Sequence, residues 1–346
     1  MTTVGAARAA AADWVARRAR ADPGYRGAYF SGSTVGRPDG APLPASSDVD
    51  VMLVTATDDP PLKPGKLRHE GVLLEVSLVP WSELASAEHV LGSYHLAGGF
   101  RTDTVIDDPT GRLRTLQARV AAGFADRRWV RRRCLDARLR IESRLAALDM
   151  SAPFHEQVTG WLFPTGVTTH VLLVAALRNP TVRLRYPAAR EVLAAYGHLD
   201  LYPELLALLG CRDLPADRVR HHLAELEATF DLTARAAVTP FFFSSDITPG
   251  ARPIAIDGSR DLIERGDHRE AMFWIVATFA RCHTILAADA PELHRVREPA
   301  FRAAVADLGI ASGEDMVGRT EEVVSFLPRL WTAAEDVLAR NPDVSG

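Results

Sequence analysis

The spacing of apolar residues changes partway along this 346-residue chain. Up to about residue 110, short apolar runs alternate with turn residues, as expected for strands. Beyond that point apolar residues recur every three to four positions, which predicts helices. The sequence therefore predicts an α+β fold, in which a small α/β domain with a mixed sheet (residues 1–125) precedes a larger all-helical domain (residues 126–346).

The predicted elements follow from this change of period and from the positions of Gly and Pro. In the first domain they are a helix over 5–20, strands over 25–30, 49–55 and 104–106, and a hairpin over 66–79 that turns at Glu70-Gly71. After about residue 110 the predicted helices span 110–123, 126–148, 154–177, 187–196, 200–210, 215–233, 259–288 and 318–340.

The composition is that of a globular protein, with 47% hydrophobic residues, 24% charged residues and a net charge of −4. A mildly acidic balance argues against a large nucleic-acid surface, which would be basic. Cys134, Cys211 and Cys282 lie far apart without a Cys-x-x-Cys pair, so neither a zinc knuckle nor a disulfide framework is indicated. Lys63 and Lys66 are the only lysines, which indicates a codon bias toward Arg.

Nothing in the sequence predicts contact with a membrane. Charged residues interrupt the Ala-rich N-terminal segment before a signal-like apolar core forms. The most apolar long stretch, residues 161–177, contains Pro164, Gly166 and His170 and is expected to be too mixed to span a bilayer. A reduced, cytoplasmic protein is the expectation.

Two carboxylates stand at the start of a predicted buried strand. Asp48 and Asp50 directly precede the apolar run 51–54, and they form the only Asp-x-Asp in the chain. Residues two apart in a strand point to the same face, with their Cα atoms roughly 6.5–7 Å apart. Carboxylates at the mouth of a buried strand require a partner, and this pair can converge on one or two divalent cations.

A third acid lies inside the second strand of the predicted hairpin. Glu75 and Ser77 share one face of the run 72–79, and the Leu and Val residues at even positions share the other face. Taken alone, Glu75 is explained by a solvent-exposed sheet face. Taken together with Asp48 and Asp50, it completes a cage of hard oxygen ligands suited to Mg²⁺.

Gly32-Ser33 follows the first predicted strand. Glycine allows close approach of the backbone, and the Ser hydroxyl and backbone N–H groups can hold phosphate oxygens. A phosphate cradle beside carboxylate-bound metal ions is the arrangement that nucleotidyl transfer requires.

Three segments carry a resemblance to a known family: Ala-Tyr-Phe-Ser-Gly-Ser (28–33), Ser-Asp-Val-Asp-Val-Met-Leu-Val (47–54) and Leu-Glu-Val-Ser-Leu (74–78). Together they resemble the polymerase-β-type nucleotidyltransferase superfamily, and most of all the bacterial antibiotic (aminoglycoside) adenylyltransferases. Members of that family carry Gly-Ser, then Asp-x-Asp, then a third acid on a later strand. In them a helical C-terminal domain closes over the acceptor.

The resemblance implies a role for each of these residues. Gly32 and Ser33 would hold the triphosphate of ATP, and Asp48 and Asp50 would bind Mg²⁺, with two ions expected. Glu75 would be either a third metal ligand or the base that deprotonates the acceptor hydroxyl. The implied reaction moves AMP from ATP to a hydroxyl of a small molecule, for example an aminoglycoside.

Two alternatives to this function stay open. One is adenylyl transfer to a protein or tRNA acceptor, and the other is a non-catalytic nucleotide-binding regulatory protein. In the helical domain, Asp246, Glu264 and Glu270 are candidates for binding a cationic acceptor, although each alone is better explained as a surface residue or helix cap.

Overall fold

The computed structural model describes residues 2–179 and 182–346, which divide into two compact units. Unit 1 comprises Met1–Arg133 and Asp343–Gly346, and unit 2 comprises Cys134–Pro342. Unit 1 contains a mixed sheet and unit 2 is helical, so the predicted α+β class is confirmed. The sequence analysis placed the division near residue 125, whereas the two units separate after Arg133, inside a helix.

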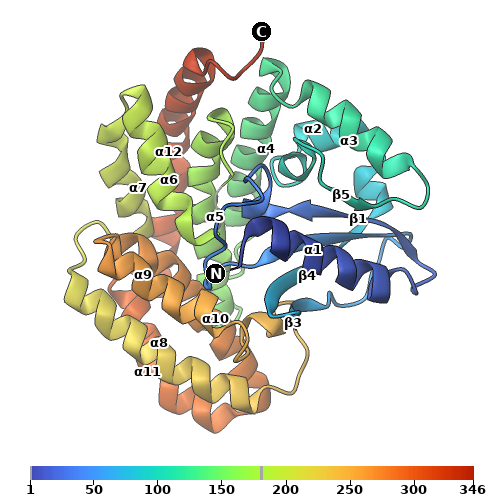
Figure 1. The fold of residues 1–346 in the computed structure, drawn as a ribbon. Helices are drawn as coiled ribbons and strands as arrows, with labels where there is room; N and C mark the ends of the chain where they lie inside the picture. Colours follow the sequence, from blue (N-terminus) through green and yellow to red (C-terminus); the bar gives the residue numbers. More distant parts are fainter. Residues whose placement is uncertain (1, 180–181) are drawn as a thin grey trace. The chain divides into compact units, whose positions relative to one another are not determined.

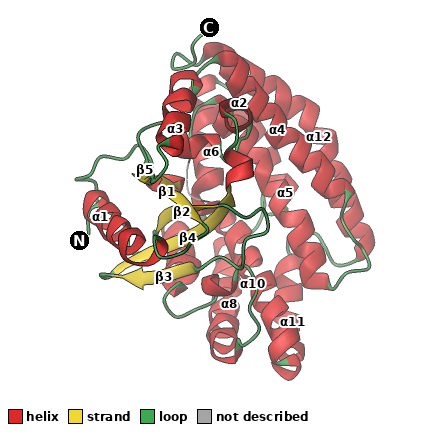
Figure 2. Ribbon diagram, turned by 90° about the vertical axis from the view of Figure 1, so that its right-hand side faces the viewer, coloured by secondary structure: helices red, strands yellow, loops and turns green. Residues whose placement is uncertain are grey.

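The sheet of unit 1 has five strands in the order β3-β4-β2-β1-β5, drawn in yellow in Figure 2. The strands are β1 (Tyr25–Ser31), β2 (Val49–Thr55), β3 (Gly65–His69), β4 (Val72–Pro80) and β5 (Val105–Asp107). Strands β2 and β4 run parallel, and the other neighbouring pairs are antiparallel. The predicted hairpin is therefore present, and its second strand lies beside β2.

Helices cover both faces of the sheet, as Figures 1 and 2 show. On one face the small residues of α1 (Val4–Trp14) pack against a core that includes Val51, Leu74 and Val76. On the other face, α2 (Ala87–Gly92) and α3 (Arg112–Gly123) pack over a second core that includes Val79. Alternate residues of β4 thus face opposite cores, so the predicted parity of this strand is confirmed.

Unit 2 is built from long helices, with α10 packed against α5, α8, α9 and α11. Their bounds are α4 (Arg127–Ala146, shared with unit 1), α5 (Phe154–Ala175), α6 (Arg185–Tyr196), α7 (Tyr202–Leu209), α8 (Ala216–Ala236), α9 (Gly258–Glu264), α10 (His268–Asp289), α11 (Pro291–Ala306) and α12 (Gly313–Arg340). Short 3₁₀ turns occur at Gly32–Thr34, Trp81–Leu84, Ala97–Phe100, Val182–Leu184, Leu199–Leu201 and Ser244–Asp246, and π turns at Val15–Ala19 and Pro253–Asp257.

Two helix predictions were wrong. The single helix expected over 259–288 is two helices, α9 and α10, because Gly266 adopts a positive φ of 87° between them. Helix α11 was not predicted, although Pro291 occupies its first turn, where proline is favourable. Pro299 lies inside α11, and a proline at such a position argues against a helix when only the sequence is read.

Two helices of unit 2, α5 and α10, are long and apolar enough to cross a membrane by length and composition alone. In each, 72% of the most apolar window is buried inside the protein, which is also the property of a core helix. The sequence analysis underestimated the apolar character of α5, since it treated Pro164, Gly166 and His170 as sufficient interruptions. Pro164 instead lies within the continuous helix.

Candidate functional site

One row of residues crosses four neighbouring strands of the sheet. Ser31 at the end of β1 pairs with Asp50 of β2, and Asp50 pairs with Glu75 of β4. Glu75 in turn pairs with Lys66 of β3. Asp48 lies just before β2. The sheet register therefore brings the three predicted acids together, with Glu75 directly beside Asp50.

Two lysines neutralise this group of acids, which we call the carboxylate site (Asp48, Asp50 and Glu75). The Nζ of Lys66 lies 2.9 Å from Oδ2 of Asp48 and also forms an ion pair with Glu75. The Nζ of Lys63 lies 2.6 Å from Oε1 of Glu75. The sequence analysis missed both lysines, although their rarity in an Arg-rich chain was a signal that could have identified them.

The electrostatic environment differs among the three acids. Burial alone would raise the pKa of Glu75, but the ammonium groups of Lys66 and Lys63 outweigh it and hold this pKa at about 2. Burial raises the pKa of Asp50 well above its usual range, and the negative charges of Asp48 and Glu75 raise it further. Burial also raises the pKa of Asp48, against the opposing effect of Lys66.

Gly32 lies against the carboxylate of Asp50. Its φ is +66°, in the left-handed region, and a Cβ atom at this position would lie 1.8 Å from Oδ2 of Asp50. Only glycine therefore fits here without moving Asp50. Ser33 is the next residue of the 3₁₀ turn and is half-buried. The predicted Gly-Ser cradle is thus adjacent to the carboxylate site.

Two arginines hold the chain that follows the cradle. An Nη atom of Arg8, on α1, donates a hydrogen bond to the carbonyl oxygen of Thr34. An Nη atom of Arg101 donates to the carbonyl oxygen of Val35. Since both donors are positively charged and reach backbone acceptors, the turn is fixed before any ligand binds.

The donor set fits a divalent cation such as Mg²⁺. All three acids offer hard oxygen ligands, which Mg²⁺ prefers. The ammonium group of Lys66 already bridges Asp48 and Glu75, so a cation is accommodated between these two carboxylates.

A second group in unit 1 has metal-ligand chemistry but is already paired. Ligand atoms of Asp13, His69 and Glu70 lie within 4.8 Å of one another. Nε2 of His69 is 2.8 Å from Oδ2 of Asp13, and Nε of Arg17 is 2.7 Å from Oδ1 of Asp13. These contacts join the tip of the β3–β4 hairpin to α1, which explains them without a metal ion.

The acids considered for acceptor binding do not converge. Asp246 is buried and pairs with Arg281 at 2.8 Å. Glu270 is buried and accepts a 2.5 Å hydrogen bond from the hydroxyl of Tyr202. Both therefore serve internal contacts of unit 2, whereas Glu264 is exposed.

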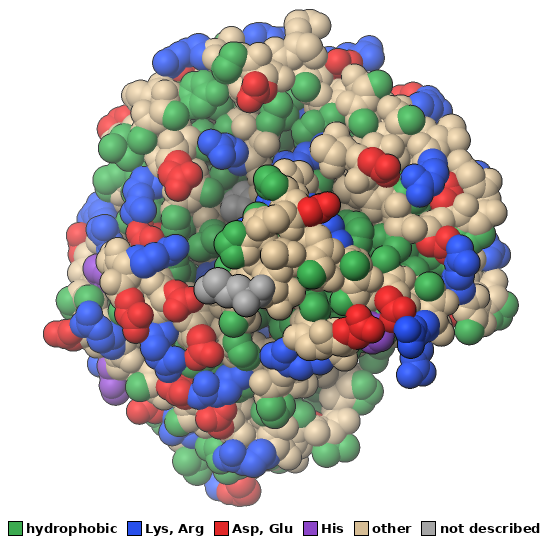
Figure 3. Space-filling view, viewed as in Figure 1, with side chains coloured by type: hydrophobic (Ala, Val, Ile, Leu, Met, Phe, Trp, Pro, Cys, Tyr) green, Lys and Arg blue, Asp and Glu red, His purple; other side chains and the backbone are tan. Residues whose placement is uncertain are grey.

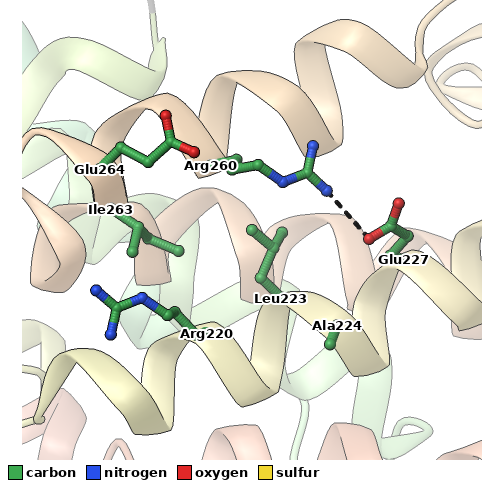
Figure 4. Close-up of a pocket in the computed structure, with 7 residues that line it drawn as sticks. All are labelled: Arg220, Leu223, Ala224, Glu227, Arg260, Ile263 and Glu264. Atoms are coloured by element: carbon green, nitrogen blue, oxygen red, sulfur yellow. Dashed lines mark hydrogen bonds and ion pairs between the residues drawn. The ribbon is translucent and has the colours of Figure 1, made fainter.

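Glu264 borders an open pocket of about 290 Å³ between α8 and α9, shown in Figure 4. Arg260 closes one side through a 3.1 Å ion pair with Glu227, drawn as a dashed line. The remaining lining residues are Arg220, Leu223, Ala224 and Ile263. Because basic and acidic side chains both border it, this pocket has no clear preference for a cationic ligand.

A group of three neighbouring histidines, two of them buried, lies elsewhere in unit 2, and we call it the histidine cluster. Its members are His155, His283 and His294. The ring centroids of His283 and His294 are 4.9 Å apart, and those of His155 and His294 are 5.8 Å apart. His283 is fully buried, and neither of its ring nitrogens has a hydrogen-bond partner among the residues that the structure describes. His155 and His294 also line a pocket of about 280 Å³.

Charged side chains of both signs are interspersed over the face of the molecule drawn in Figure 3, in keeping with the small net charge.

Comparisons with protein-family models, with curated proteins and with solved structures found no match. The function is therefore inferred from the chemistry of the carboxylate site.

Proposed function

We propose that this protein is a Mg²⁺-dependent nucleotidyltransferase that moves AMP from ATP to a hydroxyl group of a small molecule. The carboxylate site and the Gly32-Ser33 turn supply the nucleotidyl half of this proposal. The acceptor class, for example an aminoglycoside, comes from the resemblance of the sequence motifs to antibiotic adenylyltransferases.

The pairing of Asp50 with Glu75 on adjacent parallel strands is the observation that carries the proposal. Buried acids are expensive unless they are paired or bind a cation. The carboxylate site brings three acids together, two of them paired across adjacent strands, beside a glycine whose lack of a side chain leaves room for Asp50. If these positions had only a structural role, apolar residues would fill them at a lower cost in free energy. Apolar residues do occupy the opposite face of the same strands.

In the proposed reaction, the acceptor oxygen forms a bond to the α-phosphorus of ATP while the bond between this phosphorus and the β-phosphate oxygen breaks. Pyrophosphate leaves, and the hydroxyl proton passes to Glu75 or to solvent. Bound Mg²⁺ would polarise the phosphate oxygens and stabilise the charge on the leaving group. Asp48 and Asp50 would hold the metal, and Gly32-Ser33 would position the phosphates.

The two roles considered for Glu75 are not equally supported. With a pKa of about 2 while the lysines are bound, Glu75 has little affinity for a proton at neutral pH. Its charge is therefore better suited to bind cations than to act as a base. We favour the role of Glu75 as a ligand.

One observation favours a second candidate, a non-catalytic nucleotide-binding protein. Lys66 already bridges Asp48 and Glu75, as a permanent replacement for a metal ion would. A chain that kept the fold but lost turnover could retain this arrangement.

A transfer assay separates the candidates. The protein is incubated with ATP, Mg²⁺ and a panel of hydroxylated acceptors, and pyrophosphate release and acceptor mass are measured. Pyrophosphate together with an acceptor heavier by one AMP supports the proposal. Pyrophosphate with AMP attached to a protein or tRNA supports the alternative acceptor, and ATP binding without pyrophosphate supports the non-catalytic candidate.

A further inference from the structure

We propose that Lys66 is an exchangeable counter-ion of the carboxylate site. In the absence of ligands its ammonium group takes the position of a divalent cation between Asp48 and Glu75. When metal and nucleoside triphosphate bind together, Lys66 leaves this position and pairs with phosphate oxygens. The inference rests on the proposed function, since it assigns a role in nucleotide binding at the same site.

The distribution of lysines is the first observation. Only Lys63 and Lys66 are lysines among the 40 Lys and Arg residues of the chain. Both pair with the same carboxylate, that of Glu75. Codon bias accounts for the scarcity of lysine but not for this placement. Lysine carries a compact charge with three donors on a flexible stem, whereas the planar guanidinium of Arg is larger and has a fixed geometry.

The position of the ammonium group is the second observation. Lys66 contacts a carboxylate from the start of β2 and another from β4, and its side chain is only 6% exposed. A divalent cation that binds the same oxygens would approach them to about 2.0–2.1 Å. The ammonium group and the metal therefore exclude one another at this position. Metal binding requires Lys66 to move.

The charge balance indicates where Lys66 goes. If the metal alone entered, the displaced ammonium group would lose two carboxylate partners, which is unfavourable for a buried charge. A triphosphate is polyanionic and offers new partners for this group. The Gly32-Ser33 turn next to Asp50 would bring phosphates within reach of the flexible lysine stem. Metal and nucleotide are then expected to bind cooperatively, and neither binds strongly alone.

Lys63 is expected to assist in this exchange. It lies outside the strands, before β3, and its side chain is 21% exposed against 6% for Lys66. It pairs with Glu75 and does not bridge Asp48 and Glu75 as Lys66 does. Lys63 can therefore follow the triphosphate without first vacating the metal position.

The wild-type protein provides a direct test, because ¹³C labelling at the lysine Cε gives signals from only two residues. The Lys63→Arg variant assigns these NMR signals. The probes are Mg²⁺ alone, α,β-methylene-ATP alone (which does not release pyrophosphate) and both together. We expect the Lys66 signal to shift strongly only with both. An unchanged Lys66 signal, while ³¹P spectra show bound analogue, overturns the inference.

A variant gives the second test. Lys66→Met removes the charge but keeps a similar length, so Mn²⁺ should bind the free protein roughly tenfold more tightly, as expected when a competing cation is removed. At saturating Mn²⁺ the same variant should bind the ATP analogue about tenfold more weakly, because it lacks the ammonium group that would pair with phosphate oxygens. Lys63→Met is the matched control and should change the Mn²⁺ affinity less. Unchanged Mn²⁺ affinity in folded Lys66→Met, or tighter Mn²⁺ binding with no loss of analogue binding, overturns the exchange.

These results are distinguishable from those of the transfer assay. AMP transfer with a static Lys66 would overturn this inference and leave the proposed function intact. Movement of Lys66 without transfer to any acceptor would support the inference and favour the non-catalytic nucleotide-binding protein. If Lys66→Met does not fold, the labelled wild-type protein still decides the question.

Discussion

The carboxylate site of unit 1 and the histidine cluster of unit 2 bury ionisable groups in opposite ways. Around Glu75 the charges are retained and paired, with lysines against acids. His283 is buried without a hydrogen-bond partner, and burial followed by the repulsion of His294 and His155 lowers its pKa to about 3. One region keeps its charges by pairing them, and the other excludes charge.

The difference indicates which region is prepared for ionic ligands. A paired charge can exchange one partner for another at low net cost, since the total number of ion pairs is conserved. A buried neutral group has no such option and responds mainly to pH. Ligands should therefore perturb the carboxylate site, and acid should perturb the histidine cluster.

The largest effect is expected from Asp50→Asn. This change removes a carboxylate without creating a cavity, so transfer of AMP should fall by about 10²–10³-fold, as for the loss of one electrostatic catalytic group. Since the pKa of Asp50 is already raised, the free energy of unfolding should not decrease. Pyrophosphate release and thermal unfolding measure the two effects. Asp103→Asn, at an exposed position, is the control. Activity above a tenth of wild type in Asp50→Asn would contradict the metal assignment.

Gly32→Ala should produce the next largest effect. A Cβ atom here would overlap the carboxylate of Asp50, in addition to the strain of a positive φ. Gly111→Ala is the matched control, because Gly111 has a φ of +72° but no atom within 4 Å of the added Cβ. Backbone strain alone should cost about 1–2 kcal/mol of unfolding free energy. Denaturant unfolding should show a greater loss for Gly32→Ala. Equal losses would mean that Asp50 moves freely.

Acid should destabilise the histidine cluster. The folded-state pKa of His283 is about 3, below the ordinary histidine value of 6.5. Between these values the unfolded chain binds a proton that the folded protein does not, so the free energy of unfolding falls as pH decreases from about 6.5. At pH 5 the loss from His283 should be about 2 kcal/mol.

His283→Gln removes this titration and should reduce the difference in unfolding free energy between pH 7 and pH 5. His221→Gln, at an exposed position on α8, should leave it unchanged. Chemical denaturation at the two pH values measures both variants. If both retain the wild-type pH dependence, His283 does not titrate as described.

An exposed ion pair should matter least. Arg295 and Glu292 pair on α11 with side chains that are 69% and 77% exposed. Because solvent screens such pairs, Arg295→Ala should change the free energy of unfolding by less than about 0.5 kcal/mol. A larger loss, measured by denaturant unfolding, would show that exposure is a poor guide to the worth of an ion pair in this protein.

The sequence was informative where one local rule determined the structure. The apolar run after Asp50 predicted β2 with its observed bounds, and the parity of residues around Glu75 predicted which side chains of β4 share a face. The Gly-Ser, Asp-x-Asp and Glu signals also indicated the row of residues that strand pairing brings together.

The remaining features depend on tertiary contacts. The hairpin that turns at Glu70-Gly71 already sets Lys66 opposite Glu75. No local pattern indicates that Lys66 also meets Asp48, because this contact follows from the order of the strands. The histidine cluster combines residues from α5, α10 and α11, which are distant in sequence. The break at Gly266 was missed because the apolar pattern of α10 appeared to continue through it.

The row that joins Ser31, Asp50 and Glu75 also has a consequence for how the chain avoids misfolding. If β2 slipped by one residue, Asp50 would turn toward α1 and lie among the tightly packed alanines Ala7 and Ala11. An unpaired carboxylate there would cost several kcal/mol. The wrongly aligned sheet is thereby disfavoured, and the acids contribute to selecting the native arrangement before any ligand is present.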